Sequence, residues 1–267
     1  MSQLPTISVV TPTFNAAATI DETLASIQSQ NYPALDHVVV DGGSTDGTVE
    51  ILRREAEAGR LRFVSEPDNG LSDAFNKGVR MATGDVVAWL NADDTYEPGA
   101  LNAVGTAIAA EPSAEWAVGR CKIMGGDGAE SRKAVTAYKN FLLKRFSLGL
   151  YLTNNFVSSP ATFVRRNALD EVGLLDERFK YSADYDLWLR LARRGKPVYV
   201  DADVAKFRMA DDSLSITGFE DQFVEHAQNA KDNGEGHRLA VLVNQFMSKA
   251  IVFVYRSIMR WRRFRGA

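Results

Sequence analysis

The chain has 267 residues, 45% of them hydrophobic, and a formal net charge of −3 at pH 7. This size and composition suit one large soluble domain, alone or with a small appendage, and the nearly neutral charge gives no general signal of nucleic-acid binding. A single cysteine, Cys121, excludes an intrachain disulfide framework and a cysteine-based zinc site. The first residues have no basic segment before a long apolar run, so we expect no signal peptide. Nor does any run reach the roughly 18 apolar residues of a membrane span.

The N-terminal third alternates short apolar runs with helical patterns. Residues 7–13 (ISVVTPT) predict a buried strand, and residues 16–30 place Ile20, Leu24 and Ile27 on one face of a helix. The alternation continues with expected strands in 36–44, 61–70 and 85–90 and expected helices at 48–59 and 71–84. Strands that alternate with helices favour a mostly parallel sheet covered by helices on both faces.

The remaining chain is less regular. We expect strands at 116–124 and 160–166, a strand pair within 196–209, and helices at 137–152 and 184–195. The last of these helices has an apolar side and ends at Gly195. Because no repeat or clear domain boundary is present, the simplest architecture is one α/β domain with a C-terminal helical extension.

Three polar clusters each follow an expected strand of the N-terminal third. They are Thr11-Pro12-Thr13, Asp41-Gly42-Gly43-Ser44 and Asn91-Ala92-Asp93-Asp94. The carboxyl ends of parallel strands lie at one edge of a sheet, where ligands bind in such folds. We therefore expect the three clusters to meet along that edge.

Asp41 ends its strand and is followed by two glycines, Ser44 and Asp46. Glycines allow close approach of a ligand, the next helix offers amides to an anion, and Asp41 could accept a hydrogen bond from a nucleobase. A strand–turn–helix joint capped by Asp46 explains the same residues, and spacing alone leaves both interpretations open. Neither a G-x-G-x-x-G fingerprint nor a G-x-x-x-x-G-K-[ST] loop is present, so a nucleotide would be held in another way.

Asp93 and Asp94 are adjacent carboxylates at the end of an apolar strand. Their mutual repulsion and partial burial call for compensation. Mg²⁺ or Mn²⁺ would supply it, because these ions take one or two protein carboxylates together with phosphate and water oxygens. An exposed acidic turn before a helix begun by Pro98 is the alternative.

Asp184 and Asp186 stand at the start of the helix at 184–195. Acids in a first turn are stabilised by the helix dipole, so capping alone explains them. The functional hypothesis makes one of them a general base. Residues two apart on a helix lie about 200° around its axis, so only one of the two can face a reacting centre.

Four motifs, in order, resemble those of the inverting family 2 glycosyltransferases of bacteria. They are ISVVTPTFN, VVVDGGSTDGT, EPDNGLSDAFNKGVRMATGDVVAWLNADD and VGLLDERFKYSADYDLWLRLA, within a resemblance that covers about residues 5–215. The resemblance implies a GT-A-like nucleotide-diphospho-sugar transferase fold, a nucleotide-sugar donor that is most often a UDP-sugar, and a divalent metal. It implies a domain at 1–215, with a nucleotide-binding part at about 1–100 and an acceptor-side part at about 101–215.

The resemblance also assigns roles to matching positions. Asp184 corresponds to the catalytic aspartate, and Asp93 to the metal ligand, with Asp94 supporting or sharing that role. Asn91 would contact ribose or sugar, and Arg208 matches a basic position near the diphosphate. The other positions on the nucleotide side are Thr11, Pro12, Phe14, Asp41, Asp73 and Asn76.

Two positions depart from the family pattern. Asn91 replaces the first acid of Asp-x-Asp, and Ala183 replaces the Glu of Glu-Asp. We interpret LNADD and ADYDLWLR as a recurring variant of an active enzyme that acts in cell-surface polysaccharide or glycolipid synthesis. An inactive nucleotide-sugar-binding protein is the alternative from another class. A sugar-phosphate nucleotidyltransferase is disfavoured, because TPTFNAAATI lacks a glycine-rich basic phosphate loop.

The C-terminal extension, residues 216–267, is basic. No acid follows Glu235, whereas Arg256, Arg260, Arg262, Arg263 and Arg265 accompany a long apolar pattern. Such a helix commonly lies on anionic membrane, and it can equally pack on the enzyme's own core or on a second subunit. We expect a sugar or a lipid-linked acceptor. We also expect a cytoplasmic protein, which would be peripheral at the inner face of the membrane if the C-terminal helix binds lipid.

Overall fold

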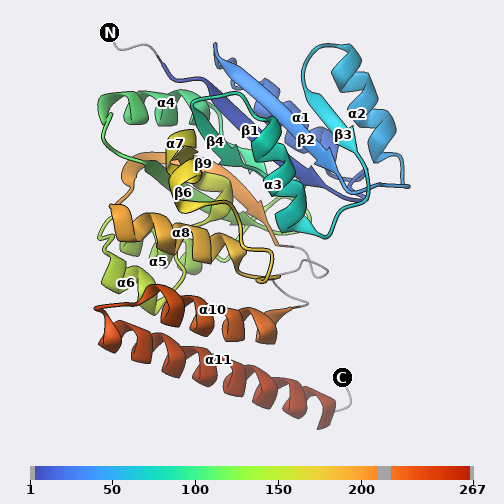
Figure 1. Cartoon of the computed structure of the whole chain (residues 1–267). Coiled ribbons are helices and arrows are strands. Elements are labelled where there is room, and N and C mark those ends of the chain that lie inside the picture. The colour runs from blue at the N-terminus through green and yellow to red at the C-terminus, as the bar shows by residue number, and fades with distance from the viewer. Residues whose placement is uncertain (1–3, 210–217, 265–267) are drawn as a thin grey trace.

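A computed structural model describes residues 4–209 and 218–264, with side chains described as far as Ser257. Its first half is a parallel sheet in the order β3-β2-β1-β4 (Figure 1). These strands are β1 (Ile7–Thr13), β2 (Leu35–Asp41), β3 (Arg62–Ser65) and β4 (Val86–Trp89). The expected alternation of strands and helices is therefore confirmed for this half.

The second half extends the same sheet with mixed pairing. Beyond β4 the order is β8-β6-β9-β5, and β7 pairs with β6. β8 is antiparallel to both β4 and β6, whereas β6 and β9 are parallel. The bounds are β5 (Thr95–Tyr96), β6 (Trp116–Met124), β7 (Glu130–Ser131), β8 (Thr162–Arg165) and β9 (Val198–Arg208). The sheet is thus parallel where the nucleotide side is expected and mixed beyond it.

The single strand β9 occupies residues 198–208, so the strand pair expected within 196–209 is wrong. The register against β6 slips between Gly119 and Arg120 and again between Arg120 and Cys121. Asp201 and Ala202 have no partner across β6 at the first slip. These polar residues therefore form a bulge in one strand, not the turn that a strand pair would need.

Helices cover both faces of the sheet. Alternate residues of β1 pack against the helices of opposite faces. Val10 packs into a cluster with α3 (Leu71–Met81) and α8 (Ala183–Arg194), whereas Val9 packs into the cluster with α1 (Ile20–Gln28) and α4 (Ala100–Ala110). Successive strand residues point to opposite faces, so an unbroken apolar strand requires a helix layer on each. The remaining helix of this half is α2 (Thr48–Glu57).

Gly78 permits the close packing of α3 on the sheet. A Cβ at this position would lie 2.3 Å from Cγ1 of Val10 and 3.3 Å from Cγ2 of Val40. Only glycine lets the helix approach β1 and β2 this closely. The approach fixes α3 beside the carboxyl ends of those strands.

The second half carries the other helices. Residues 137–152 form parts of two helices rather than one, because Ser147 caps a new helix by accepting a hydrogen bond from the Leu150 amide at 3.2 Å. The helices are α5 (Lys133–Leu143), α6 (Leu148–Thr153), the short 3₁₀ helix η1 (Ser159–Ala161), α7 (Arg166–Val172), α10 (Phe219–Asn233) and α11 (Arg238–Phe264). The helix predicted at 184–195 is confirmed as α8, with Gly195 directly after it.

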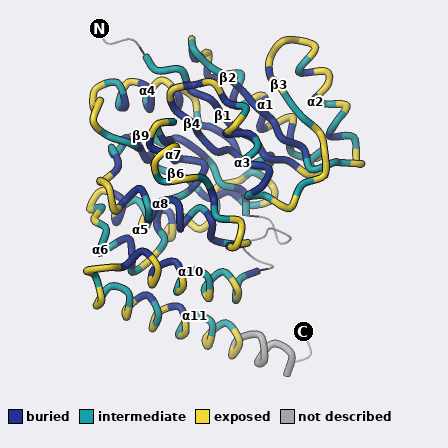
Figure 2. The backbone as a smooth tube through the Cα atoms, in the orientation of Figure 1, coloured by how far each residue is buried: buried dark blue, intermediate teal, exposed yellow. Residues whose placement is uncertain are grey.

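α11 lies along the outer side of α10, at the edge of the molecule (Figure 1). Residues 238–257 are long and apolar enough to cross a membrane by length and composition, which a search for unbroken apolar runs missed. Only 11% of that window is buried, and Figure 2 shows much of the helix exposed. The side chains of Arg260, Arg262 and Arg263, and all of Arg265, lie outside the described residues.

Candidate active site

The polar clusters after β1, β2 and β4 lie at one edge of the sheet, as expected. Thr13 pairs with Asp41, and Asp41 pairs with Ser65 of β3. The Leu90 amide donates to the Val10 carbonyl at 3.1 Å, so the chain after β4 leaves beside Thr11. Strand register therefore brings the three clusters together.

Asp41 is completely buried beneath the loop that follows it. Its Oδ2 accepts hydrogen bonds from the Gly43 amide at 3.1 Å, the Ser44 amide at 2.9 Å and the Ser65 hydroxyl at 2.6 Å. The Ser44 hydroxyl donates to Oδ1. Both oxygens thus bind the chain's own loop and the neighbouring strand β3.

Thr11, Pro12 and Phe14 are divided between the interior and the surface. Thr11 and Pro12 are buried, and Oγ1 of Thr11 lies 3.1 Å from Nε2 of His37. Phe14 is 63% exposed, and its ring lies against the backbone of Gly42. Phe14 is therefore the member of this group that a ligand can cover.

Asp68 lies with the exposed Phe14 ring over Gly42, and we call these two residues the rim. No sequence pattern assigned Asp68 a role in the site. A Cβ on Gly42 would lie 2.7 Å from Oδ2 of Asp68 and 3.3 Å from the Phe14 ring. The missing side chain lets an aromatic face and a carboxylate meet over one peptide. The Pro67-Asp68-Asn69-Gly70 turn was the only available signal. Below the rim, the buried hydroxyl of Thr13 has no hydrogen-bond partner among the described residues.

Asp73 and Asn76 on α3 serve different contacts. Asp73 accepts a hydrogen bond from the Asn69 amide at 3.0 Å, which lowers the pKa of its carboxyl. Asn76 is buried, donating to the Leu175 carbonyl and accepting from the Leu175 amide, both at 3.0 Å. The contacts of Asn76 join α3 to the segment before α8.

The turn after β4 is built around Asp94. This carboxylate is completely buried, with Oδ1 accepting the Arg208 amide at 2.8 Å and Oδ2 facing the Asn91 amide nitrogen at 3.3 Å. Asn91 in turn accepts a hydrogen bond from Nε1 of Trp89 at 2.5 Å. Burial, and secondarily the charge of Asp93, raise the pKa of Asp94 well above its usual range.

Arg208 binds the same turn from the end of β9. Its guanidinium donates to the carbonyl oxygens of Asp93 at 2.9 Å and Gly126 at 3.0 Å, and to the Glu22 carboxylate at 2.5 Å. Its side chain is nearly buried. Arg208 therefore lies beside the acidic pair, with its donors directed at protein oxygens.

The acidic turn suits a divalent cation held by few protein ligands. Asp93 is half-buried; Asp94 is buried, with one oxygen accepting the Arg208 amide and the other facing the Asn91 amide nitrogen. Across the described part of the chain, no three histidine, cysteine or acidic side chains gather as a metal site. Mg²⁺ and Mn²⁺ sites that borrow phosphate oxygens need only one or two carboxylates. The residues therefore fit a metal on Asp93, with Asp94 holding the turn.

Asp184 lies in the first turn of α8. Its Oδ2 accepts a hydrogen bond from the Ser159 hydroxyl of η1 at 2.5 Å, and its Oδ1 accepts from the Tyr185 amide at 2.7 Å. Burial raises the pKa of the Asp184 carboxyl, against the lowering effect of the Ser159 hydrogen bond and the Lys139 charge. Sequence reasoning missed Ser159 and Lys139, because they belong to distant segments that carry no motif.

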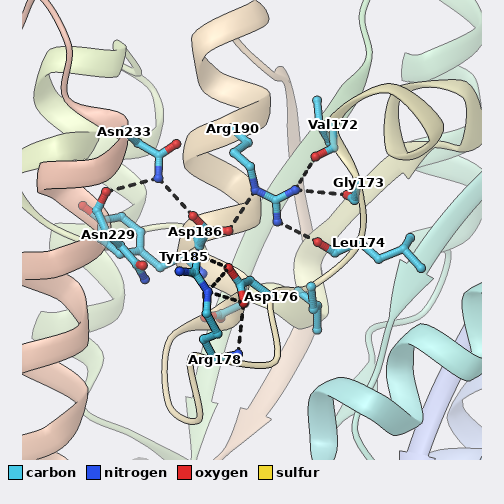
Figure 3. Close-up of polar contacts among 12 residues, drawn as sticks. Val172, Gly173, Leu174, Asp176, Arg178, Tyr185, Asp186, Arg190, Asn229 and Asn233 are labelled. Atoms are coloured by element: carbon cyan, nitrogen blue, oxygen red, sulfur yellow. Dashed lines mark hydrogen bonds and ion pairs between the residues drawn. The ribbon is translucent and has the colours of Figure 1, made fainter.

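Asp186 has contacts of another kind (Figure 3). Its Oδ2 pairs with Nε of Arg190 at 2.8 Å, and its Oδ1 accepts from the Asn233 amide of α10 at 3.0 Å. Arg190 also donates to backbone carbonyls at the end of α7, including that of Leu174 at 2.7 Å. Asp186 therefore fastens α8 to its neighbours, and the two aspartates are not equivalent.

η1 connects the surroundings of Asp184 with the acidic turn. It packs against β4, which leads into the turn that carries Asp93, and against β9, which ends at Arg208. Burial raises the pKa of Cys121 to about 12; the charge of Asp94 also raises it, and the charge of Lys139 lowers it. Burial lowers the pKa of Lys139, and the charge of Asp184 opposes that shift. η1 therefore contacts both Asp184 and the strands next to the acidic turn.

Known proteins resemble this chain in sequence and fold. A family model, Glycosyl transferase family 2, matches residues 8–173. A PGL/p-HBAD biosynthesis glycosyltransferase of Mycobacterium tuberculosis is 30% identical over 270 residues, covering 98% of this chain and 99% of the relative.

Two solved structures share the fold at lower identity. S. aureus TarS 1–349 in complex with UDP-GlcNAc has a TM-score of 0.66 and 19% identity, over 84% of this chain and 66% of that one. The chain spans 39% of a longer TarS structure. A Pyrobaculum calidifontis mannosyltransferase in complex with GDP-Man and Mn²⁺ has a TM-score of 0.66 and 20% identity, over 99% of this chain and 83% of that one.

Proposed function

The chain belongs to glycosyl transferase family 2, and from this premise we propose an inverting, metal-dependent transfer of a sugar. The donor is a nucleotide-diphospho-sugar, and the acceptor is a hydroxyl group of a sugar or a lipid-linked saccharide. The product contributes to a cell-surface polysaccharide or glycolipid. The relative named for PGL/p-HBAD biosynthesis, similar over nearly its whole length, supports a biosynthetic role of this kind.

The observation that carries the proposal is the environment of Asp184. A general base works best when its pKa lies near the working pH, and burial moves this carboxyl in that direction. The Ser159 hydroxyl and the Tyr185 amide fix both oxygens, so the carboxylate is oriented before any substrate arrives. Asp186 is instead held by an ion pair with Arg190 and a hydrogen bond from Asn233.

The transfer proceeds as a single displacement. Asp184 takes the proton of the acceptor hydroxyl, and the oxygen forms a bond to the anomeric carbon from the face opposite the phosphate. The bond from that carbon to the phosphate oxygen breaks, and the nucleoside diphosphate leaves with the electron pair. Attack from the opposite face inverts the anomeric configuration.

The donor is held by the sheet edge. The exposed Phe14 ring covers the base or ribose above Gly42, and Thr11 and Pro12 form the floor of this pocket. Asp41 acts mainly through the loop that it fixes, and Asp73 binds the Asn69 amide at the start of α3.

Asp93 would hold Mg²⁺ or Mn²⁺, which supplies charge neutralisation for the diphosphate when bound. Hydrogen bonds of Asp94 and Arg208 hold the turn that carries Asp93. Asn91, tethered to Trp89, presents its remaining donor toward ribose or sugar. Metal dependence finds support in the Mn²⁺ present with the mannosyltransferase.

The two neighbours carry different nucleotides, UDP-GlcNAc and GDP-Man. We favour a UDP-sugar, on the strength of the family resemblance in VVVDGGSTDGT. The test is hydrolysis of a panel of UDP- and GDP-sugars by purified protein with Mg²⁺ or Mn²⁺, followed by NMR of the released sugar. An inverted anomer from a UDP-sugar supports the proposal, and a retained anomer contradicts it. Nucleotide binding without turnover of any donor, with acceptor mixtures present, would support the inactive alternative.

A further inference from the structure

The surface of α11 has a polarity opposite to that of an ordinary surface helix. The face toward the enzyme carries the buried polar residues Asn244 and Ser248. Asn244 donates to the Leu152 carbonyl at 2.9 Å and lies 3.5 Å from the Tyr185 hydroxyl, and Ser248 donates back to Asn244 at 3.3 Å. A surface helix normally buries its apolar stripe and exposes its polar one. In α11 polar hydrogen bonds help to attach the helix.

Large apolar side chains occupy the opposite face. Phe246 and Phe253 are 71% and 73% exposed, among the most exposed large hydrophobic side chains of the described chain. At 100° per residue, they lie within about 20° of each other around the helix. We call this surface the outer stripe, and its members are Leu239, Leu242, Val243, Phe246, Met247, Phe253 and Val254. An exposed apolar surface of this extent usually marks an interaction site.

Basic residues border the outer stripe. Arg238, Lys249 and Arg256 fall at nearly the same angle along one margin of the helix. No acidic residue occurs between Gly236 and Ser257. The only described ion pair of this margin joins Arg256 to Glu220 of α10 at 2.7 Å. The stripe therefore combines apolar side chains with positive charge.

We propose that the outer stripe of α11 lies on an anionic lipid surface, parallel to the membrane plane. Phenylalanine and leucine side chains entering the headgroup boundary, with lysine and arginine beside them, are the arrangement that binds such surfaces. The helix does not span the bilayer, because Asn244 and Ser248 keep its other face attached to the enzyme. The long stem of Lys249 reaches the phosphates from the margin.

Charge disfavours a second copy of the chain as the occupant. A two-fold interface brings the same patch of both subunits together. The basic margin would then face its own copy, and the stripe offers no acid to compensate. Like charges across an interface oppose association, whereas anionic lipid complements the same charges.

The experiment is flotation of the full chain with vesicles of phosphatidylcholine alone or with one-third phosphatidylglycerol. The test variant is Phe246→Gln/Phe253→Gln. Its matched control is Val135→Gln/Phe141→Gln on α5, where both side chains are also exposed. Thermal unfolding of each variant verifies the fold, and light scattering without vesicles measures the oligomeric state.

We expect wild type and control to float with anionic vesicles and to float poorly with neutral ones. The test variant should bind at least about tenfold more weakly, since two large apolar side chains are lost from the contact. Lys249→Glu should weaken binding to anionic vesicles, and salt should do the same. Equal flotation of wild type and test variant would overturn the proposal, as would equal loss in test variant and control. A wild-type dimer that the test variant dissociates, without flotation, would assign the stripe to a second copy.

Discussion

Replacing Asp184 by asparagine keeps the shape of the side chain and removes the base. The amide oxygen can still accept from the Tyr185 amide, and the Ser159 hydroxyl can accept from the new NH₂ group. The fold should therefore survive. Loss of a general base costs about 10²–10⁴ in rate, so we expect turnover to fall by at least about two orders of magnitude. Nucleotide affinity should change only by about a few-fold, because the donor pocket and Asp93 are intact.

The same substitution should stabilise the protein at neutral pH. Burial raises the folded-state pKa of Asp184 above its unfolded value. The native state then binds more protons than the unfolded state between those two values, so stability falls as pH rises through that window. The asparagine side chain of Asp184→Asn cannot ionise and escapes this penalty, so the melting temperature at pH 7 should rise. The gain should vanish in acid below both pKa values.

Asp186→Asn is the matched control, two residues away on the same helix. It breaks the pair with Arg190, which retains its backbone carbonyl partners. Leaving a partly buried charged donor without its carboxylate costs about 1–3 kcal/mol. For a chain of this size, that is about 2–4 °C in melting temperature per kcal/mol. Turnover per folded molecule should remain near wild type.

The assay combines sugar transfer, donor binding by calorimetry and thermal unfolding for both variants. The expected result is a crossed pattern, in which Asp184→Asn loses turnover without losing stability and Asp186→Asn does the reverse. Near wild-type transfer by Asp184→Asn, together with loss in folded Asp186→Asn, would refute the reasoning and make Asp186 the base.

Three further substitutions test separate parts of the site. Asp93→Ala should reduce turnover nearly to background, and a chelator should do the same to wild type; full activity in chelator would contradict a metal on this residue. Ser159→Ala removes a hydrogen bond that lowers the pKa of Asp184, so the acid limb of the kcat/KM pH profile should move to higher pH, and an unmoved limb would argue against this contact. Gly78→Ala inserts a Cβ 2.3 Å from a methyl of Val10 and should cost about 1–3 kcal/mol in chemical denaturation, whereas an unchanged midpoint would show that α3 is free to shift.

The parallel half could be predicted because its signals are local. The apolar run of β1 and the spacing of Ile20, Leu24 and Ile27 each carry their own periodicity, and all three helix positions are buried. Parallel strands then place their carboxyl ends together by topology alone. The edge that gathers Thr13, Asp41 and the acidic turn follows without knowledge of any side-chain contact.

The mixed half depends on contacts between distant segments. The bulge in β9 exists only against β6, so the strand read alone looked like a hairpin. Ser159 and Lys139 reach Asp184 from 25 and 45 positions away, and neither stands in a recognisable motif. Arg208 was found by resemblance, but its carbonyl partners could not be read from sequence.

The difference between Asp184 and Asp186 could be predicted in part from the sequence. Helix geometry shows that the two carboxylates point apart, and Arg190 four residues after Asp186 is a signal for an ion pair on that face. The partner from α10, Asn233, was beyond reach because no sequence pattern fixes how α10 packs on α8. The roles of both residues in catalysis stay predictions until the variants are measured.

The hydrogen bond from Asn244 to the Leu152 carbonyl has a consequence during synthesis on the ribosome. The strands β1 to β4 and the helices between them are contiguous, so this half can collapse while later residues are still in the exit tunnel. The Leu152 carbonyl and the Tyr185 hydroxyl can contact Asn244 only after it is translated, nearly sixty residues after Tyr185. Nascent chains should therefore acquire a protease-resistant N-terminal half first, and the half bearing Asp184 should stay a chaperone client until α11 emerges.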